Sequence, residues 1–358
     1  MREALWLAER GRGHTKLNPL VGALVVKDGV IRSRGYHAFF GGPHAEIVAL
    51  KRAGRAANGA TLYVTLEPCS TQGKTPPCTE AIIQSGIKKV VIGSFDPNPQ
   101  HHKRGVRILR KNNIAVSVGL LKNEIKKQNE AFFTRMSKKR PFVTVKMAQS
   151  LDGKSATRTG DSQWISGITS RTGVHQLRKN VDAVLVGKQT VLYDDPSLTV
   201  RFVSSTKNPA RVILDTQGEI PLTKKVFHYA TRDQVIIVVS KKVSSRKIAL
   251  YQKKGISVIQ APLYRQKIDV AFVLKRLVDF HIGTVLVEGG GNVAASFFER
   301  KLVDKMFLFC APLIIGGMHA PTSVEGNGVA CIKKAIRFRN VSYSKSGNDY
   351  LFEGYPIY

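Results

Sequence analysis

The residues in this chain best suited to chemistry are a histidine, a glutamate and two cysteines: His44, Glu46, Cys69 and Cys78. A zinc ion used for catalysis takes three protein ligands, often nitrogen and sulfur, and keeps a fourth position for a water molecule that becomes acidic. His44, Cys69 and Cys78 supply three such ligands. Glu46 lies two residues after His44 in the first turn of an expected helix, where it could move protons to and from that water.

A bland interpretation of His44 and Glu46 is the polar first turn of an amphipathic helix, because Pro43 suits the first helical position and an acid is favoured near the positive end of the helix dipole. The two cysteines favour the metal site, since each follows a proline in a loop. An H-x-E motif followed by Pro-Cys and a second cysteine is typical of zinc deaminases, in which the glutamate is the general acid and base. Here eight residues, rather than two, separate Cys69 from Cys78.

The longer spacing points to a particular family. The segment 66–78 resembles the deaminase half of the bifunctional pyrimidine deaminase/reductase of riboflavin biosynthesis, and so do 15–22, 35–37 and 96–99. The resemblance implies removal of the exocyclic 2-amino group from a ribosylated diaminopyrimidinone phosphate. It also implies that zinc is bound by His44, Cys69 and Cys78, that Glu46 is catalytic, and that the substrate contacts Asn18, His37 and Lys74.

Three positions near the expected pocket depart from the family pattern. The family usually carries a histidine in place of Thr71, a small residue or proline in place of Leu17, and a glycine in place of Lys103. These departures leave open a non-enzymatic alternative, in which the first half has lost deamination and the chain retains reduction or binding. The intact set of His44, Glu46, Cys69 and Cys78 argues against that alternative.

The second half carries a further ordered series of motifs, which includes 146–154, 160–166, 186–191 and 288–291. This series resembles the reductase half of the same family, which has a dihydrofolate-reductase-like fold and uses NADPH. The resemblance places the cofactor at Ala148, Trp164, Thr190, Asp194, Thr216, Gly289, Gly290 and Gly291. It places the substrate at Lys146, Ser162, Arg178, Leu198, Arg201 and Glu288.

Part of this assignment has a physical reason. Glycines at the start of a helix let backbone N–H groups approach a phosphate, although a glycine triplet alone is also a common turn. The run 289–291 does not match G-x-G-x-x-G, so a Rossmann domain is not expected. Arg178 and Arg201 suit a phosphate because guanidinium groups bind it bidentately, although surface ion pairs explain many single arginines. Lys146 is a candidate to polarise the ribosyl group.

Short β-branched runs alternate with helical stretches through both halves, which predicts an α/β protein with mostly parallel sheets. A cationic segment ending at Arg140 precedes Pro141 and a new strand. We therefore expect a cytidine-deaminase-like α/β/α domain at 1–140 and the reductase domain at 141–358. Strands are expected at 22–27, 61–66, 88–94, 114–118, 142–146, 182–187, 210–215, 234–239, 284–288 and 305–310, and helices at 43–53, 77–85, 104–112 and 293–300.

The net charge is +31, from 56 Lys and Arg against 25 Asp and Glu. This charge supports an alternative function, a deaminase that edits transfer RNA with an accessory C-terminal half. The basic residues are spread along the chain without a basic tail, however, so nucleic acid is not the favoured partner.

No apolar run is long enough for a membrane span, and few cysteines are present, so we expect a cytoplasmic protein. The family resemblance further implies a homo-oligomer.

Overall fold

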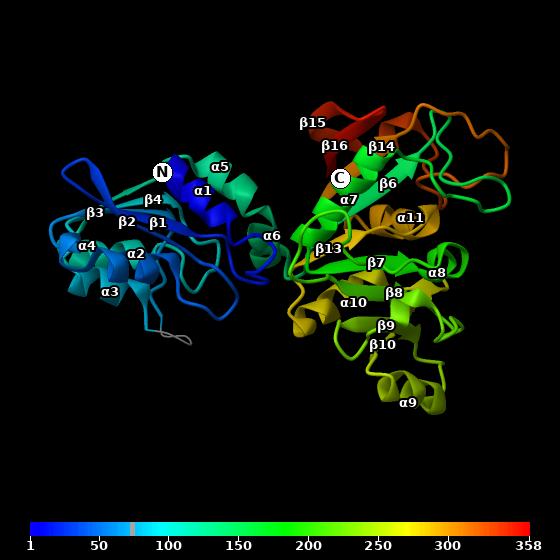
Figure 1. The fold of residues 1–358 in the computed structure, drawn as a ribbon, viewed down its shortest axis with the longest axis horizontal. Helices are drawn as coiled ribbons and strands as arrows, with labels where there is room; N and C mark the ends of the chain where they lie inside the picture. Colours follow the sequence, from blue (N-terminus) through cyan, green and yellow to red (C-terminus); the bar gives the residue numbers. More distant parts are fainter. Residues whose placement is uncertain (72–75) are drawn as a thin grey trace. The chain divides into compact units, whose positions relative to one another are not determined.

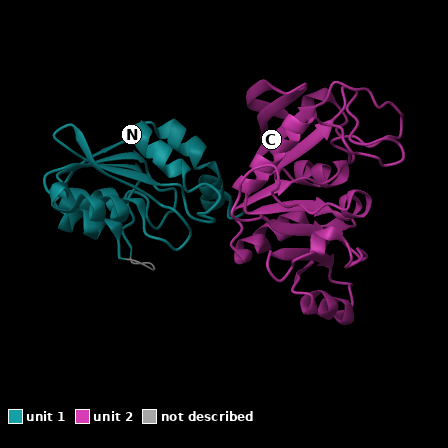
Figure 2. Ribbon diagram, in the orientation of Figure 1, with its two compact units in different colours: residues 1–140 teal, residues 141–358 magenta. Residues whose placement is uncertain are grey.

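The computed structural model describes residues 1–71 and 76–358, and it divides the chain into two compact units, Met1–Arg140 and Pro141–Tyr358 (Figure 2). Each unit has its own sheet and its own hydrophobic cores. The boundary follows helix α6 (Glu130–Lys138) and precedes strand β6 (Phe142–Gln149). Each unit is therefore described separately.

The described part of the N-terminal unit has a five-stranded sheet in the order β2-β1-β3-β4-β5. Figure 1 labels four of these strands, β1 to β4. The strands are β1 (Gly22–Lys27), β2 (Val30–Tyr36), β3 (Thr61–Leu66), β4 (Lys89–Ser94) and β5 (Ala115–Val118). The helices before α6 are α1 (Arg2–Glu9), α2 (Ala45–Ala53), α3 (Cys78–Gln84), α4 (Arg104–Lys111) and α5 (Lys122–Gln128).

Helices cover both faces of this sheet. Alternate residues of a strand point to opposite faces, so Ala23 and Val25 of β1 pack with α2, α3 and α4 in one core, while Leu24 packs with α1 on the other face. The prediction of a mostly parallel sheet is confirmed for β3, β4 and β5. It is wrong for β1, which pairs antiparallel with both β2 and β3. The two-residue turn at 28–29 returns the chain from β1 to β2 as a hairpin.

The described C-terminal unit has a nine-stranded sheet in the order β10-β9-β8-β7-β13-β6-β14-β16-β15, and β11 pairs separately with β12. Its strands after β6 are β7 (Ala183–Gly187), β8 (Ala210–Leu214), β9 (Val235–Ser240), β10 (Ser257–Ala261), β11 (Leu263–Tyr264), β12 (Lys267–Ile268), β13 (Thr284–Val287), β14 (Lys305–Cys310), β15 (Arg337–Ser346) and β16 (Asp349–Ile357). Its helices are α7 (Ile168–Asn180), α8 (Lys188–Asp194), α9 (Ser245–Lys253), α10 (Val270–Leu277) and α11 (Gly291–Glu299).

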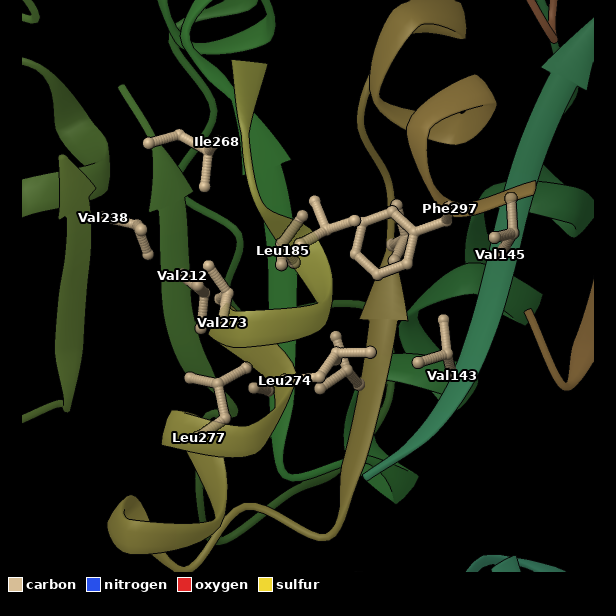
Figure 3. Packing of buried hydrophobic residues seen from close by; sticks show 14 of the residues in the cluster. Val143, Val145, Leu185, Val212, Val238, Ile268, Val273, Leu274, Leu277 and Phe297 are labelled. Carbon is tan, nitrogen blue, oxygen red and sulfur yellow. The ribbon is translucent and has the colours of Figure 1, made fainter. Parts of the chain in front are cut away.

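The central strands of this sheet are parallel and buried on both faces, which explains their continuous apolar sequences. One face packs against α10 and α11, where Val273 and Phe297 meet alternate residues of the strands such as Val145 and Leu185 (Figure 3). The residues between them, such as Val184, form a second core on the opposite face, which includes Tyr251 of α9. Because these strands are parallel, their carboxyl ends lie at one edge of the sheet.

Candidate active sites

His44, Cys69 and Cys78 converge although the sequence separates them. His44 is the residue before α2, Cys69 lies in the loop after β3, and Cys78 is the first residue of α3. The Nδ1 atom of His44 is 3.2 Å from Cys78 Sγ and 3.5 Å from Cys69 Sγ, and the three ligand atoms lie within 4.8 Å of one another. Tetrahedral zinc bonds of about 2.1 Å to nitrogen and 2.3 Å to sulfur require separations of roughly this size, so the donor set fits zinc.

The surroundings of this donor set favour an anionic sulfur. Hydrogen bonds from Cys78 and His44 lower the pKa of Cys69 to about 4, and the backbone N–H of Cys78 donates to Cys69 Sγ over 3.3 Å. The hydrogen bond to Cys69 raises the pKa of His44 to about 9. The thiolate is the form of cysteine that binds metals, so Cys69 is prepared as a ligand.

Glu46 lies beside the donor set in the first turn of α2. Its side chain is only 3% exposed, and it lines a cavity of about 210 Å³ together with His44 and Cys69. Burial raises its pKa above the ordinary glutamate value. The cavity therefore brings a carboxyl group and the metal ligands to the same small volume.

Asn18 and His37 line the same cavity, and their hydrogen bonds fix their orientation. The carbonyl of Pro43 only accepts, so His37 Nδ1 donates to it over 3.0 Å. Burial lowers the pKa of His37, so the ring is neutral and its Nε2 accepts from Asn18 Nδ2 over 3.0 Å. Lys74, the third residue expected to contact substrate, lies outside the described residues.

Sequence reasoning missed several residues of this cavity. Asp96 and Asn98 line it, and the loop that carries them is anchored by buried Glu67, whose carboxylate accepts the backbone N–H groups of Asp96 and Lys103 over 3.3 and 3.0 Å. The motif Asp-Pro-Asn-Pro at 96–99 was the available signal. Arg135 of α6 also lines the cavity and donates to the Leu17 carbonyl over 2.8 Å, and no pattern in the sequence indicated it.

The departures from the family pattern at Thr71 and Lys103 have different structural consequences. Thr71 Oγ1 lies 3.5 Å from Nδ1 of His101, and His101 itself lines the cavity, so an imidazole is present at this wall. Lys103 does not belong to the described lining of the cavity. It has a φ of 61°, a left-handed conformation that favours glycine, and its ammonium lies 5.7 Å from the Phe95 ring centroid. The lysine therefore affects the backbone of the loop rather than the cavity.

In the C-terminal unit, a cavity of about 420 Å³ lies at the carboxyl edge of the sheet. Ligands of open α/β sheets bind at this edge. The residues from the sequence analysis that line it are Ser162, Thr190, Asp194, Thr216, Gly290 and Gly291. Ser162 Oγ donates to Asp194 over 2.7 Å, which joins the loop before α7 to the end of α8.

The glycines before α11 have unequal space. A Cβ atom on Gly291 would lie 2.3 Å from the Thr322 carbonyl oxygen, and one on Gly289 would lie 2.7 Å from Val293 Cβ, so both need glycine for packing. A Cβ on Gly290 meets no atom of the described residues within 4 Å, and Gly290 lines the cavity. The backbone at Gly290 is therefore open to a ligand.

This difference gives a prediction. Gly290→Val is expected to leave thermal unfolding unchanged and to weaken NADPH binding by roughly tenfold to a hundredfold, because its side chain enters the cavity. Gly291→Ala is the matched comparison, and it is expected to lower the free energy of unfolding by about 1–3 kcal/mol. Calorimetric titration and thermal melts check both variants. If Gly290→Val bound NADPH with wild-type affinity, this loop would not belong to the binding site.

The other residues expected at the cofactor lie elsewhere. Ala148 and Trp164 are absent from the described lining of the 420 Å³ cavity. Ala148 lies on β6 beside Phe309 of β14. Trp164 is 66% exposed, and the Arg171 guanidinium lies 4.4 Å from its ring centroid.

Among the residues expected to contact substrate, Arg178 and Glu288 form a buried ion pair, with two hydrogen bonds of 2.7 and 2.9 Å. Arg178 Nη1 also donates to the Thr199 carbonyl over 3.2 Å. Burial disfavours the charge of Glu288, but the charges of Arg178 and Lys146 outweigh it and lower the pKa of Glu288. The Arg178 guanidinium therefore already has partners in Glu288 and the Thr199 carbonyl, and it holds the Glu288 carboxylate in place.

Three residues surround this pair. Burial lowers the pKa of Lys146, which lies on β6 close enough to feel the charge of Glu288. Arg201 is exposed, and its backbone N–H donates to His175 Nδ1 over 3.0 Å. Burial and the nearby arginines lower the pKa of His175 to about 4, so its ring is neutral. Leu198 is 2% exposed and belongs to the second core, so it supports the loop that carries Arg201.

No helix among the described residues is long and apolar enough to cross a membrane. Residues 1–94 match the family model described as the cytidine and deoxycytidylate deaminase zinc-binding region. Residues 141–352 match the RibD C-terminal domain.

Curated relatives match over nearly the whole chain. The riboflavin biosynthesis protein RibD of Aquifex aeolicus is 44% identical, with 98% of this chain and 95% of the relative covered. RibD of Escherichia coli is 36% identical, with 88% of each chain covered.

Solved structures agree with these matches. One structure of Acinetobacter baumannii RibD superposes with a TM-score of 0.88 at 33% identity and covers 99% of this chain and 97% of that chain. A second structure is that of the Thermotoga maritima diaminohydroxyphosphoribosylaminopyrimidine deaminase/5-amino-6-(5-phosphoribosylamino)uracil reductase. It superposes with a TM-score of 0.85 at 40% identity and covers 100% of this chain and 97% of that chain. The fold is therefore a cytidine-deaminase-like domain followed by a dihydrofolate-reductase-like domain.

The match of 141–352 leaves the transfer-RNA-editing alternative unfavoured, because the half assigned there to RNA binding is a RibD C-terminal domain. The other comparisons cover residues 1–94 with the deaminase zinc-binding region and nearly the whole chain with RibD proteins. The chain belongs to the RibD family, the bifunctional deaminase/reductase enzymes of riboflavin biosynthesis.

Proposed function

We propose that the N-terminal unit deaminates the 2-amino group of 2,5-diamino-6-ribosylamino-4(3H)-pyrimidinone 5′-phosphate, and that the C-terminal unit then reduces the ribosyl group of the product. The single observation that carries the first step is the convergence of His44, Cys69 and Cys78 beside buried Glu46. The second step is supported by the cavity at the glycine loop and the buried ion pair between Arg178 and Glu288.

In the deaminase site, His44, Cys69 and Cys78 hold zinc, which when bound makes a water molecule acidic enough to attack the pyrimidine. Glu46 takes the proton of that water on its carboxylate and returns protons to the ring nitrogen and the departing amine. A carbon–oxygen bond forms, the carbon–nitrogen bond breaks, and ammonia leaves. Asn18 and His37 orient the ring, because their hydrogen bonds to each other and to Pro43 hold both side chains at the cavity.

In the reductase site, NADPH when bound would supply a hydride for the ribosyl C1′ atom. The bond from C1′ to the ring oxygen would then break, and that oxygen would gain a proton, which gives the open ribityl chain. Arg178 holds Glu288 in a fixed orientation at this site. Arg201, which is exposed and forms no ion pair within the described residues, is the better candidate to bind the substrate phosphate.

Removal of zinc tests the division of labour. Cys78→Ser, or treatment with a strong chelator, is expected to abolish ammonia release, while NADPH oxidation with supplied deaminated substrate persists. Cys331→Ser is the control, because Cys331 is exposed and lies outside the ligand set. Metal analysis and the two assays check the result. Ammonia release at the wild-type rate without zinc would contradict the assignment.

We also propose that the chain forms a homo-oligomer through β15. This strand is at the edge of the nine-stranded sheet and exposes Val341 (40%) and Tyr343 (75%). An exposed edge strand with apolar side chains favours pairing with another chain. Light scattering on the wild type and on Val341→Lys/Tyr343→Lys measures the assembly. A wild-type protein that is monomeric at micromolar concentration would contradict this proposal.

A further inference from the structure

A second cavity continues from the cofactor cavity along the same edge of the C-terminal sheet. It has a volume of about 690 Å³, and the two cavities share Lys188, Leu214 and Thr216. The second cavity extends to Ser240, at the end of β9, whose backbone N–H donates to the Thr216 carbonyl over 3.0 Å. A ligand that binds at Gly290 and Thr216 can therefore extend past β8 to β9.

This second cavity is basic. Lys188, Lys242 and Lys247 line it, and its described lining contains no aspartate or glutamate. Lys188 forms an ion pair of 2.6 Å with Glu219, so its charge is balanced. Within residues 1–71 and 76–358, the side chains of Lys242 and Lys247 form no ion pair. Two lysines without an ion-pair partner among these residues thus line the far end of the cavity.

The position of Lys247 is unusual for a lysine. It lies in the first turn of α9, which contains no acidic residue, although cations are unfavourable at the positive end of a helix dipole. A Cβ atom on Gly218 would lie 3.6 Å from Lys247 Cδ and Cε, so the lysine stem lies over the turn that follows β8. The side chain is therefore directed back from α9 toward the residues after Thr216. An anion bound there would offset both the charge of Lys247 and the positive end of the α9 dipole.

We propose that Lys242 and Lys247 bind the 2′-phosphate of NADPH, with Ser240 and Ser244 as hydroxyl partners, and so select NADPH over NADH. This inference rests on the proposed reductase function. Neighbouring strands are about 4.8 Å apart, so the edge from β13 to β9 spans about 14 Å. A dinucleotide that passes the glycine loop after β13 and crosses β7 and β8 brings its adenosine ribose to this basic end. The phosphate on that ribose is the group that distinguishes NADPH from NADH.

The test compares binding of two dinucleotides. Calorimetry measures NADPH and NADH affinities for the full chain and for Lys242→Gln/Lys247→Gln. The double variant is expected to bind NADPH about 10- to 100-fold more weakly and NADH as the wild type does, since charge-assisted hydrogen bonds to the phosphate are lost. Lys242→Arg/Lys247→Arg is expected to retain the preference for NADPH. The matched control is Lys241→Gln/Lys254→Gln, which removes two exposed charges outside the cavity.

A second pair of ligands shows whether Lys242 and Lys247 bind the 2′-phosphate or the pyrophosphate. Adenosine 2′,5′-bisphosphate is expected to bind the wild type and to lose most of its affinity for the glutamine double variant, whereas adenosine 5′-monophosphate is expected to bind both equally. Equal losses for NADPH and NADH, an unchanged NADPH affinity, or the same loss in the control variant would each overturn the inference. A wild type that binds both dinucleotides equally well would also overturn it while leaving reduction intact. A wild type that binds neither would instead contradict the reductase function.

Discussion

Replacement of Glu46 by glutamine is expected to lower the rate of ammonia release by about 10²- to 10⁴-fold, because general acid–base catalysis contributes about that much. Glutamine has nearly the same shape as glutamate, but it cannot accept and return a proton. Glu46 lines the cavity beside His44 and Cys69 without belonging to the ligand set. Zinc content and NADPH oxidation with supplied deaminated substrate are therefore expected to remain at wild-type values.

The control for this substitution is Glu80→Gln. Glu80 also lies in the first turn of a helix, α3, two residues after the zinc ligand Cys78, but it is exposed. The control is expected to release ammonia at the wild-type rate. If Glu46→Gln also kept the wild-type rate with zinc bound, another group would have to move the proton, and Glu46 would be a structural residue.

Arg178→Met is expected to have the largest effect on stability, a fall of about 3–5 kcal/mol in the free energy of unfolding. The substitution leaves Glu288 buried without its partner, and an unpaired buried charge is strongly unfavourable. Reduction is expected to be lost as well, since Glu288 is no longer oriented. Replacing both residues, as Arg178→Met/Glu288→Met, is expected to recover much of the stability without activity. Chemical denaturation and NADPH oxidation measure the two effects.

The pH dependence of the free energy of unfolding tests the Arg178→Met prediction independently. The pKa of Glu288 is lowered in the folded wild type, so the ion pair stabilises the fold above the ordinary glutamate pKa, and this stability is lost as the pH falls through the lowered value. In Arg178→Met, burial favours the protonated carboxyl group. The stability difference between wild type and variant is therefore expected to shrink from about pH 7 to about pH 5. A difference that is constant with pH would show that lost packing, rather than charge, causes the destabilisation.

The zinc site could be predicted because its chemistry depends on residue types that stand in short, local motifs. Each ligand lies at the start of a helix or just after a strand, and apolar patterns in the sequence mark those elements. The apolar runs also identified the central strands of both sheets. Strand β2 was missed because its only buried residues are Ser33 and Gly35, and its sequence lacks a clear apolar alternation.

Other features depend on tertiary structure that local patterns do not encode. Arg135 reaches the deaminase cavity from α6, more than a hundred residues after Leu17, whose carbonyl it contacts. His101 Nδ1 lies 3.5 Å from Thr71 Oγ1, on a loop whose Lys103 backbone N–H donates to Glu67. The interpretation of Arg178 as a phosphate ligand followed from the family resemblance and from guanidinium chemistry, whereas the structure engages that guanidinium with Glu288 and Thr199. The role of such a side chain depends on residues that are distant in sequence and close in the folded structure.

The central claim is that one chain performs deamination before reduction, and a single time course tests it. Purified chain with zinc is given the diaminopyrimidinone ribosyl phosphate and NADPH, and ammonia and NADPH oxidation are followed together. We expect ammonia to appear first and NADPH oxidation to follow, with one equivalent of each at completion, and Glu46→Gln to abolish both signals. NADPH oxidation without ammonia release, in the wild type or in Glu46→Gln, would contradict the proposed order of the two reactions.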